Sequence, residues 1–554
     1  MKIITTFLFC ISSVFGYAQK EKKQLISQTY SGITKQQQLT EEELKSWHRK
    51  DISNDTIPGV SLDRAYTELL QGKKAQEVIV AVLDTKLDIY HEDIKQQIWV
   101  NTDEILDNGI DDDHNGYIDD CNGWDFLSNT KGEYLRYEHF EMVRIVRKYD
   151  AVFKDKSEED IPNDQKDKYK LYHKAKKALH GYIDEEKDFI VYANHWLDTY
   201  PKAKKNLKKL FPKEEYTISQ LDSILNTTQK DSLIQSYTKM IKAAIKYDLT
   251  PELYKDYLDQ TEEGLKTTAN VDFKEREIIG DNQEDMSNIH YGSNQVYGEV
   301  PFPHSISVTG VLAATRNNGI GIKGFSDHIK VMPVVMVASG DEHDKDVAVA
   351  IRYAVDNGAK IINMSWGKDF SLHQDWVQDA IRYAAEKDVV LVNGSGNDAG
   401  DIDIRKHYPS DYINDKEIVD NFIMVGASSY TLDKKLRASF SNYGKKNVDL
   451  FAPGNKMYTT DINNTYDFSR GTSISTPVVS GIAALIRSYY PNLRAMQVKE
   501  ILMKSGVSYN IDIEIKQKDG SKKLVPFSEL SKSGKIVNAY NALLMAEQIS
   551  KSKN

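Results

Sequence analysis

The chain has 554 residues, of which 40% are hydrophobic and 10% aromatic, a composition that excludes an intrinsically disordered protein. It is longer than one ordinary core requires, so we expect two folded units or one domain with a large insertion. The formal charge is −10, with 72 basic residues interspersed among 82 acidic ones, which excludes the basic block expected of a nucleic-acid-binding protein.

The N-terminus, MKIITTFLFCISSVFGYAQK, has one lysine, an apolar run of signal-peptide length and small residues before its end. We predict a signal peptide over residues 1–18, cleaved after Ala18, and therefore a secreted or periplasmic protein. A single membrane anchor is the alternative, but the run is short and interrupted by Thr and Ser. No later segment reaches membrane-spanning length, so we expect no membrane span in the mature chain.

The small number of cysteines suggests that a bound metal ion, rather than a disulfide bond, stabilises the mature protein. Cys10 lies inside the predicted signal, so the mature chain would keep only Cys121 and could form no internal disulfide. A secreted protein without disulfides gains from another source of stability, and a bound metal ion is one.

The first predicted strand follows a polar stretch. Residues 19–60 are rich in Gln and Lys, and we interpret them as a lead-in or a short pro-segment. The run EVIVAVLD then predicts a strand buried on both faces of a parallel sheet, with Asp84 at its end. Parallel sheets hold their sites at the carboxyl ends of strands, which makes Asp84 a candidate functional residue.

The next feature is an acidic loop, DNGIDDDHNGYIDDCNGWDF. Its spacing matches the ligand positions of an EF-hand-type calcium loop, with Gly116 at the sharp turn and Asn122 instead of a bidentate Glu at position twelve. The predicted ligands are Asp111, Asp113, Asn115, the carbonyl of Tyr117 and Asp119. We predict a structural Ca²⁺ site; a metal-free, turn-rich loop is the alternative.

Residues 129–284 differ in amino-acid composition from the segments before and after them. Segments rich in Lys, Glu and Tyr carry apolar residues at spacings of three and four, which predicts amphipathic helices. We interpret this region as a helical insertion. Its helices could simply pack, solvated, on the main domain; alternatively, they could gate the active site or dock a partner.

From residue 285 the pattern alternates between helices and strands. Helices are predicted at 304–315, 346–358, 374–386 and 473–490, and strands at 329–337, 360–366, 389–393 and 422–428. Strands separated by helices indicate right-handed crossovers and a doubly wound parallel sheet of the α/β class. Residues 61–128 and 285–548 would then form two parts of one domain, followed by a polar tail at 549–554.

Two further candidate residues could act in catalysis together with Asp84. His304 begins one predicted helix, and Ser473 begins another directly after a Gly-Thr pair. A serine hydroxyl becomes nucleophilic when a histidine takes its proton, and a buried carboxylate fixes the tautomer of that histidine. The chain order Asp, His, Ser is the subtilisin order.

The motifs VAVLDT, HSISVTGVLAA and GTSISTP, in this order, resemble those of the subtilisin-like serine peptidases (subtilases, peptidase family S8). The resemblance covers about residues 60–128 and 285–548, and it implies a subtilisin-like fold with a secreted serine endopeptidase activity through an acyl-enzyme. It implies catalytic roles for Asp84, His304 and Ser473. The segment VLVNGSGND is similar to the family's oxyanion segment and implies that role for Asn397.

The resemblance also implies a substrate-binding edge and a set of partners. IINMSWG is similar to the family strand that pairs with the substrate backbone. The implied substrate-binding residues are Ser365, Trp366, Gly367, Ser395 and Gly396. The expected partner is a polypeptide substrate, with no nucleic acid, and we expect a monomer.

Two departures from the family pattern leave an alternative open. Ser305 and Ile306 stand where the family has Gly-Thr after the histidine, and Lys86 stands where it usually has Gly. A subtilase-like pseudoenzyme that binds peptides or a partner would tolerate these changes. A hydrolase of non-peptide esters is disfavoured, because no G-x-S-x-G elbow appears and the chain order of Asp, His and Ser is wrong for such an enzyme.

Overall fold

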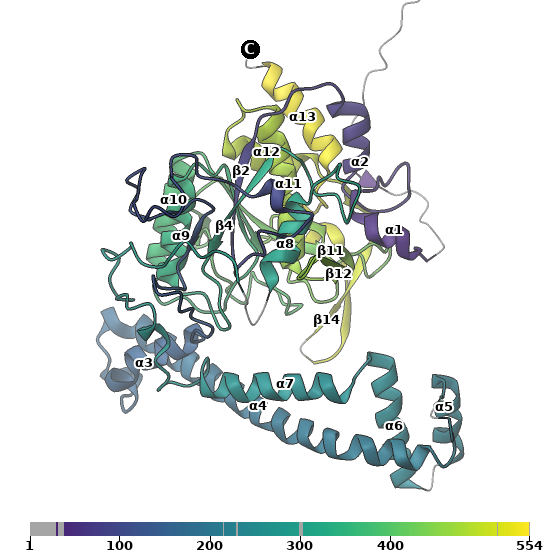
Figure 1. Ribbon diagram of the computed structural model, residues 1–554. Coiled ribbons are helices and arrows are strands. Elements are labelled where there is room, and N and C mark those ends of the chain that lie inside the picture. The colour runs from purple at the N-terminus through teal and green to yellow at the C-terminus, as the bar shows by residue number, and fades with distance from the viewer. Residues whose placement is uncertain are drawn as a thin grey trace, which may run out of the picture.

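A seven-stranded β-sheet lies at the centre of the computed structural model, which describes residues 29–30, 38–213, 215–228, 231–298, 303–517 and 519–552 (Figure 1). All neighbouring strands in this sheet are parallel. In spatial order they are β10 (Leu450–Pro453), β9 (Phe422–Ser428), β6 (Val390–Gly394), β5 (Ile361–Met364), β2 (Val78–Asp84), β4 (Ile329–Val335) and β3 (Trp124–Asp125). The predicted parallel sheet is therefore confirmed.

Helices cover both faces of the sheet. One face carries α8 (His304–Ala313), α11 (Thr472–Tyr489) and α13 (Ala539–Ser552), and the other carries α9 (Asp344–Asp356) and α10 (Gln374–Glu386). Val80 and Val82 of β2 belong to the first hydrophobic cluster, while Ala81 and Leu83 belong to the second. Because successive strand residues point to opposite faces, the apolar run of β2 is what a doubly covered sheet requires.

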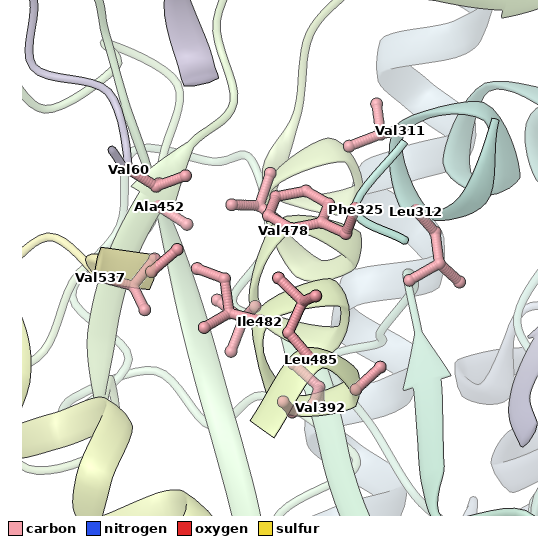
Figure 2. Close-up of a cluster of buried hydrophobic side chains, with 14 of the residues drawn as sticks. Val60, Val311, Leu312, Phe325, Val392, Ala452, Val478, Ile482, Leu485 and Val537 are labelled. Carbon is pink, nitrogen blue, oxygen red and sulfur yellow. The ribbon is translucent and has the colours of Figure 1, made fainter. Parts of the chain in front are cut away.

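Helix α11 runs through the larger cluster (Figure 2). Its side chains Val478, Ile482 and Leu485 are fully buried, and Val392 of β6 lies against them. Burial of each such side chain contributes roughly 1.5–3 kcal/mol. The helix that carries the candidate nucleophile in its first turn is therefore firmly fixed on the sheet.

The predicted lead-in, residues 19–60, joins the same core in its later part. Trp47, Ile52 and Val60 are fully buried in the larger cluster. The indole Nε1 of Trp47 also donates a hydrogen bond of 3.0 Å to the carbonyl of Lys456. These residues therefore stabilise the folded domain, although the boundary of the lead-in stays a prediction.

The helices of the insertion form an arm beside the sheet domain (Figure 1). They are α3 (Glu141–Phe153), α4 (Lys166–Leu207), α5 (Ile218–Thr227), α6 (Ser232–Tyr247) and α7 (Pro251–Lys266). Helix α4 has 42 residues and is therefore about 63 Å long. In Figure 1, α7 returns beside α4, and the three helices α4, α6 and α7 share a small hydrophobic cluster of their own.

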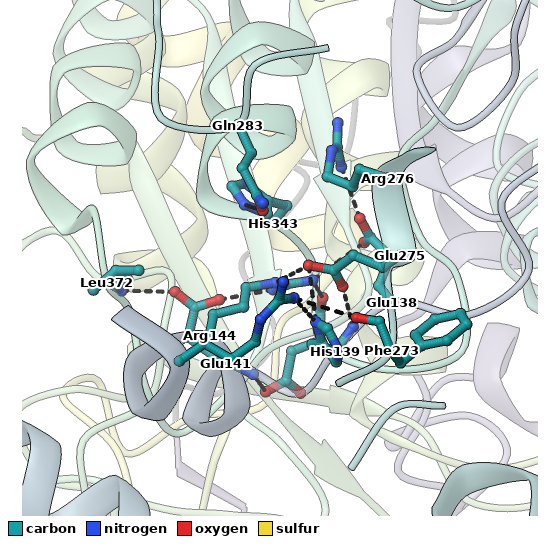
Figure 3. A network of polar contacts seen from close by, with 12 residues as sticks. Glu138, His139, Glu141, Arg144, Phe273, Glu275, Arg276, Gln283, His343 and Leu372 are labelled. Carbon is teal, nitrogen blue, oxygen red and sulfur yellow. Dashed lines mark hydrogen bonds and ion pairs between the residues drawn. The ribbon is translucent and has the colours of Figure 1, made fainter. Parts of the chain in front are cut away.

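Buried charges join the base of this arm to the sheet domain (Figure 3). Arg144 of α3 lies 2.8 Å from a carboxylate oxygen of Glu141 and 3.5 Å from one of Glu275. Arg276, where the insertion returns, donates two hydrogen bonds of 2.7 and 2.9 Å to the carboxylate of Asp346 in α9. Because these groups are almost inaccessible to water, separating the arm from the domain would leave buried charges unpaired.

Some elements were not predicted from the sequence. They are the short strands β3 and β10, the helices α12 (Ala495–Ser505) and α13, and the hairpins β11 (Met457–Asp461) with β12 (Thr465–Ser469) and β14 (Asp512–Lys516) with β15 (Lys522–Pro526). Helices α12 and α13 thus follow the last helix predicted from the sequence, 473–490. The predicted signal peptide, residues 1–18, lies outside the described residues. Among the described residues, no helix combines the length and the apolarity needed to cross a membrane.

Candidate active site

The three candidate catalytic residues begin or end regular elements. Asp84 is the last residue of β2, at the carboxyl edge of the sheet. His304 is the first residue of α8, and Ser473 is the second residue of α11. The sheet edge and two helix N-termini thus hold these side chains on rigid elements, far apart in the sequence.

Asp84 and His304 form a direct contact. Nδ1 of His304 lies 2.9 Å from both carboxylate oxygens of Asp84, and the Asp84 side chain is 1% exposed. Burial by itself lowers the pKa of the imidazole, but the charge and the hydrogen bond of Asp84 outweigh burial and raise this pKa above 6.5. The carboxylate therefore orients the ring and stabilises its protonated form.

The residues that depart from the family pattern support this contact. The backbone N–H of Ser305 donates to Oγ1 of Thr85 at 3.1 Å, and its hydroxyl donates to the carbonyl of Lys86 at 2.6 Å. Ile306 is 1% exposed and packs in the larger hydrophobic cluster. Two hydrogen bonds therefore tie the start of α8 to the two residues that follow β2, beside Asp84 and His304.

The side chain of Lys86 runs away to β3. Its ammonium lies 3.2 Å from a carboxylate oxygen of Asp125 and 4.5 Å from the ring centroid of Tyr134. Burial raises the pKa of Asp125 to about 6, and the charge of Lys86 opposes this rise. The bulk of Lys86 is thus accommodated in a buried ion pair.

Ser473 and Asn397 border the same small space next to Gly471. Gly471 has a φ of +147°, and a Cβ added there would lie 3.5 Å from Oγ of Ser473 and 3.7 Å from Nδ2 of Asn397. Oδ1 of Asn397 accepts hydrogen bonds from the N–H and the hydroxyl of Thr472, at 2.9 and 3.2 Å. Because the oxygen of the amide is held in this way, its N–H groups are turned to the space beside Ser473.

A proline in α11 frees the carbonyl of Ser473 for a side-chain contact. Pro477 stands four residues after Ser473 and has no N–H to offer to that carbonyl. The hydroxyl of Ser365 donates to it instead, at 2.8 Å, and itself accepts a hydrogen bond of 2.9 Å from Asn363. This chain fixes the first turn of α11 against β5.

An open cleft of about 860 Å³ runs past these residues. Its walls include Ser473 and Asn397 together with four of the predicted substrate-binding residues, Ser365, Trp366, Gly367 and Gly396. The fifth, Ser395, is fully buried behind the wall, and its hydroxyl donates to the carbonyl of Asn442. The indole of Trp366 donates to the carbonyl of Leu83, which joins the cleft wall to the strand of Asp84.

The acidic loop gathers three carboxylates. Ligand atoms of Glu104, Asp111 and Asp113 all lie within 4.8 Å of one another. Carboxylates this close repel each other unless a cation or protons intervene, and such oxygens are the ligands that Ca²⁺ prefers. The donor set of the loop therefore fits a calcium ion.

The remaining predicted ligands make other contacts. The carboxylate of Asp119 accepts the N–H groups of Asn108 and Gly109, at 3.1 and 2.9 Å. Oδ1 of Asn115 accepts the N–H of Tyr117 at 2.8 Å, and the amide of Asn115 donates to Asp113 at 3.1 Å. The cluster of three carboxylates thus includes two of the predicted ligands, Asp111 and Asp113, but not Asp119.

Sequence reasoning missed Glu104 and the contribution of the insertion to the cleft. Glu104 stands seven residues before Asp111, and its position next to Asp103 in a polar loop was the only local signal. The insertion supplies Phe140, Met142 and Tyr182 to the cleft wall. No local pattern announces these, because their position depends on how the arm returns to the domain.

Comparisons with known proteins show which family the chain resembles. A family profile described as the subtilase family matches residues 75–524. The thermophilic serine proteinase of Bacillus sp. (strain AK1) is 37% identical over 187 residues, which cover 33% of this chain and 42% of that protein. Thermitase of Thermoactinomyces vulgaris is 37% identical over 186 residues, which cover 33% of this chain and 61% of thermitase. The matches thus span less than two thirds of either relative.

A solved protease structure from Pseudoalteromonas arctica is 26% identical, with a TM-score of 0.36 and coverage of 44% of this chain and 71% of that one.

Proposed function

The chain belongs to the subtilase family, and from this we propose that it is a secreted serine endopeptidase that hydrolyses peptide bonds through an acyl-enzyme. Ser473 would be the nucleophile, His304 the general base and then acid, and Asp84 the residue that orients the imidazole. The substrate would be a polypeptide, since the cleft beside Ser473 is open at the surface.

The contact between Asp84 and His304 carries this proposal. With Nδ1 held 2.9 Å from the carboxylate, the ring proton of the neutral imidazole belongs on Nδ1, and the lone pair of the other nitrogen, Nε2, is the one that can take a proton. A carboxylate that is 1% exposed stabilises the imidazolium more strongly than one in water.

Catalysis would proceed in two halves. The hydroxyl oxygen of Ser473 attacks the carbonyl carbon of the peptide bond while His304 takes its proton. His304 then gives this proton to the leaving amine, and the acyl group stays on Ser473. A water molecule, deprotonated by His304, attacks the acyl carbon, and the proton returns to Ser473 as the acid product leaves.

Asn397 would stabilise the oxyanion of both tetrahedral intermediates. Its Nδ2 borders the space next to Ser473, and the backbone N–H of Ser473 lies in the first turn of α11, where N–H groups have no partner within the helix. The helix N-terminus adds a favourable dipole for negative charge. One such donor is worth about 3–4 kcal/mol in the transition state.

Calcium would be a structural cofactor of the acidic loop. Glu104, Asp111 and Asp113 would hold the ion through carboxylate oxygens. The bound ion would supply positive charge that offsets the mutual repulsion of the three side chains. This role is one of stability, since the loop lies outside the set of residues that line the cleft.

Labelling with a fluorophosphonate probe tests the proposed activity. The purified, processed protein should react at Ser473, and Ser473→Ala should abolish the reaction. Mass spectrometry of the labelled peptide would identify the modified residue. A processed wild-type protein that folds but takes up no label would contradict the peptidase and favour a subtilase-like protein that only binds peptides.

A further inference from the structure

A second groove continues the active-site cleft into the arm. This groove, which we call the arm groove, has a volume of about 660 Å³ and lies between α4 and α7. Phe140, Tyr182 and Glu185 line both the cleft and the arm groove. The loop at 339–342 also reaches both, since its first two residues line the arm groove and its last two line the cleft. A polypeptide chain in the cleft could therefore extend into the arm groove without a break.

The lining of the arm groove combines acidic and aromatic side chains. Its carboxylates come from Glu185, Glu186 and Glu263, and its aromatic rings include those of Phe189 and Tyr257. No lysine or arginine is among the described residues that line it. Such a surface attracts a ligand with positive charge and apolar or aliphatic parts, as in the side chains of lysine and arginine.

An unpaired carboxylate lies where the cleft meets the arm groove. Glu342 lines the cleft and is 6% exposed, and its Oε2 has no hydrogen-bond partner among the described residues. A buried carboxylate oxygen without a partner is costly unless a ligand supplies one. Burial and the neighbouring charge of Asp341 raise the pKa of Glu342 to about 8, and a cationic side chain of a bound polypeptide would supply the positive charge and the N–H donors that stabilise its ionised form.

Ring packing, an ion pair and a hydrogen bond hold the wall between the two spaces. The rings of Phe140 and Tyr182 pack edge to face, with centroids 5.0 Å apart. Directly after the cleft residue Gly367, Lys368 lies 3.1 Å from Glu141 at the start of α3. Glu141 in turn accepts the N–H of Leu372 at 2.7 Å (Figure 3). The arm thus presents a preformed surface to the cleft.

We propose that the arm groove is an extended substrate-binding site, in which Glu185 and Glu186 of the groove and Glu342 of the adjoining cleft wall select polypeptides with Lys or Arg several residues from the scissile bond. This inference rests on the proposed peptidase function. It makes the helical insertion a specificity element, instead of a gate or a solvated appendage.

Long quenched-fluorescence peptides test the proposal. Four peptides of about twelve residues would share one cleavage sequence. They carry either two Lys or two Glu about four to six residues from the scissile bond, on its N-terminal side in one pair and on its C-terminal side in the other; each extended residue spans ~3.3 Å. We expect kcat/KM to favour the Lys peptide by about tenfold or more on one side only. Glu185→Gln/Glu186→Gln and, separately, Glu342→Gln should reduce this preference to about twofold or threefold.

Matched controls separate this proposal from the peptidase itself. Glu262→Gln removes an exposed carboxylate of α7 that does not line the arm groove, and it should leave the tenfold preference unchanged. Fluorophosphonate labelling reports Ser473 independently of the arm groove. A wild type that labels but cleaves the Lys and Glu peptides equally would overturn the extended site alone, as would an undiminished preference in the variants. A wild type that neither labels nor cleaves overturns the peptidase.

Discussion

Nδ1 of His304 lies 2.9 Å from each carboxylate oxygen of Asp84, and these residues are 220 positions apart in the chain. The whole helical arm is inserted between them. The contact nevertheless forms, because β2 and α8 belong to the same sheet domain and the arm leaves and returns at loops. The family pattern of a long-range Asp and His pair is thus compatible with a large insertion.

Replacement of Asp84 by Asn should lower kcat by about four orders of magnitude. The variant can keep the hydrogen bond from the N–H of Thr85 to Oδ1, which is 2.8 Å long, so we expect a folded protein. It would stabilise the wrong tautomer of His304 and lose the negative charge. Initial rates on a peptide substrate, with circular dichroism as a check on folding, measure the effect. Asp88→Asn, a nearby loop variant, is the control, and equal rates in Asp84→Asn and wild type would contradict the triad.

The pH dependence follows from the same pair. Because Asp84 raises the pKa of His304 above 6.5, the neutral base and hence kcat/KM should appear only as pH rises above that value. The sign for stability is opposite: the pair stabilises the fold below the unfolded pKa of the histidine, and this contribution is lost as pH rises through the folded pKa. In Asp84→Asn the acidic limb of the residual activity should move to lower pH. If the acidic limb of the profile stays at the same pH, the group that titrates there is not His304.

Asn397→Leu should lower kcat by about 100- to 1,000-fold with little change in KM. The variant removes the only side-chain amide that borders the space beside Ser473 among the described lining residues of the cleft. Thr472→Val is the matched control, because it removes the hydroxyl contact to Asn397 but keeps the backbone N–H that binds its oxygen. Steady-state kinetics on one peptide would compare the two. A larger loss in Thr472→Val than in Asn397→Leu would argue against the amide as an oxyanion donor.

The sequence predicted the elements whose burial is strongest. β2 and β9 were predicted because they are apolar on both faces, and α10 was predicted with the bounds 374–386 that the structure gives. β3 has only two residues and is too short to show any periodicity. Its place at the sheet edge depends on pairing with β4, which is a tertiary contact.

The candidate site was predictable to the extent that its residues sit in local motifs. Asp111 and Asp113 follow from the spacing within one loop, whereas Glu104 joins them only because the chain folds back. The role of Ser305 in binding the Lys86 carbonyl could not be read from either segment alone, since it is a contact between α8 and the segment that follows β2. Tyr182 lines the cleft only because the arm folds back along the sheet domain, and no local motif encodes that path.

Chelation of calcium should lower the melting temperature by several degrees. If the ion binds the native loop alone, saturation at 100 times Kd contributes about 2.7 kcal/mol, which EGTA would remove. Thermal unfolding with and without EGTA measures this difference. Asp111→Asn/Asp113→Asn should unfold at the same temperature in both conditions.

Asp112→Asn is the control for the calcium prediction. Asp112 lies in the same loop but accepts hydrogen bonds from Ile105 and Asn108, at 3.1 and 2.7 Å, which an Asn oxygen can also accept. This variant should keep the full response to EGTA. A wild type that melts at the same temperature with EGTA and with calcium would favour a metal-free loop.

Trp47→Ala should lower the free energy of unfolding by about 3–5 kcal/mol, the usual cost of removing a buried Trp. Trp47 is 0% exposed and its indole donates to the carbonyl of Lys456. Urea unfolding of the mature protein measures the change. Glu42→Ala, at an exposed position of α1 (Glu41–Ser46), should change it by less than about 0.5 kcal/mol. Similar small effects for both variants would indicate that this stretch behaves as a detachable segment.

Lys368→Met should destabilise the protein by about 3–5 kcal/mol near neutral pH. The ammonium of Lys368 is 2% exposed and lies 2.8 Å from Asp344 and 3.1 Å from Glu141. Its loss removes the cation shared by these two buried carboxylates, and Glu141 keeps only its contact with Arg144, at 2.8 Å, among the ion pairs of the described residues. Burial and the charge of Asp344 already raise the pKa of Glu141 to about 7. Without the lysine this pKa rises further, and protonation then relieves the repulsion. The loss of stability should therefore shrink as pH falls from 8 to 6.

The double variant Lys368→Met/Glu141→Gln separates charge from packing. Gln removes one of the two facing charges but keeps an oxygen for the N–H of Leu372. If repulsion causes the loss, urea unfolding should show that the double variant recovers part of the stability and loses most of its pH dependence. If Lys368 acts instead through the packing of its alkyl chain, the double variant will be less stable than Lys368→Met at every pH. The first outcome is expected, because both carboxylates are almost fully removed from water.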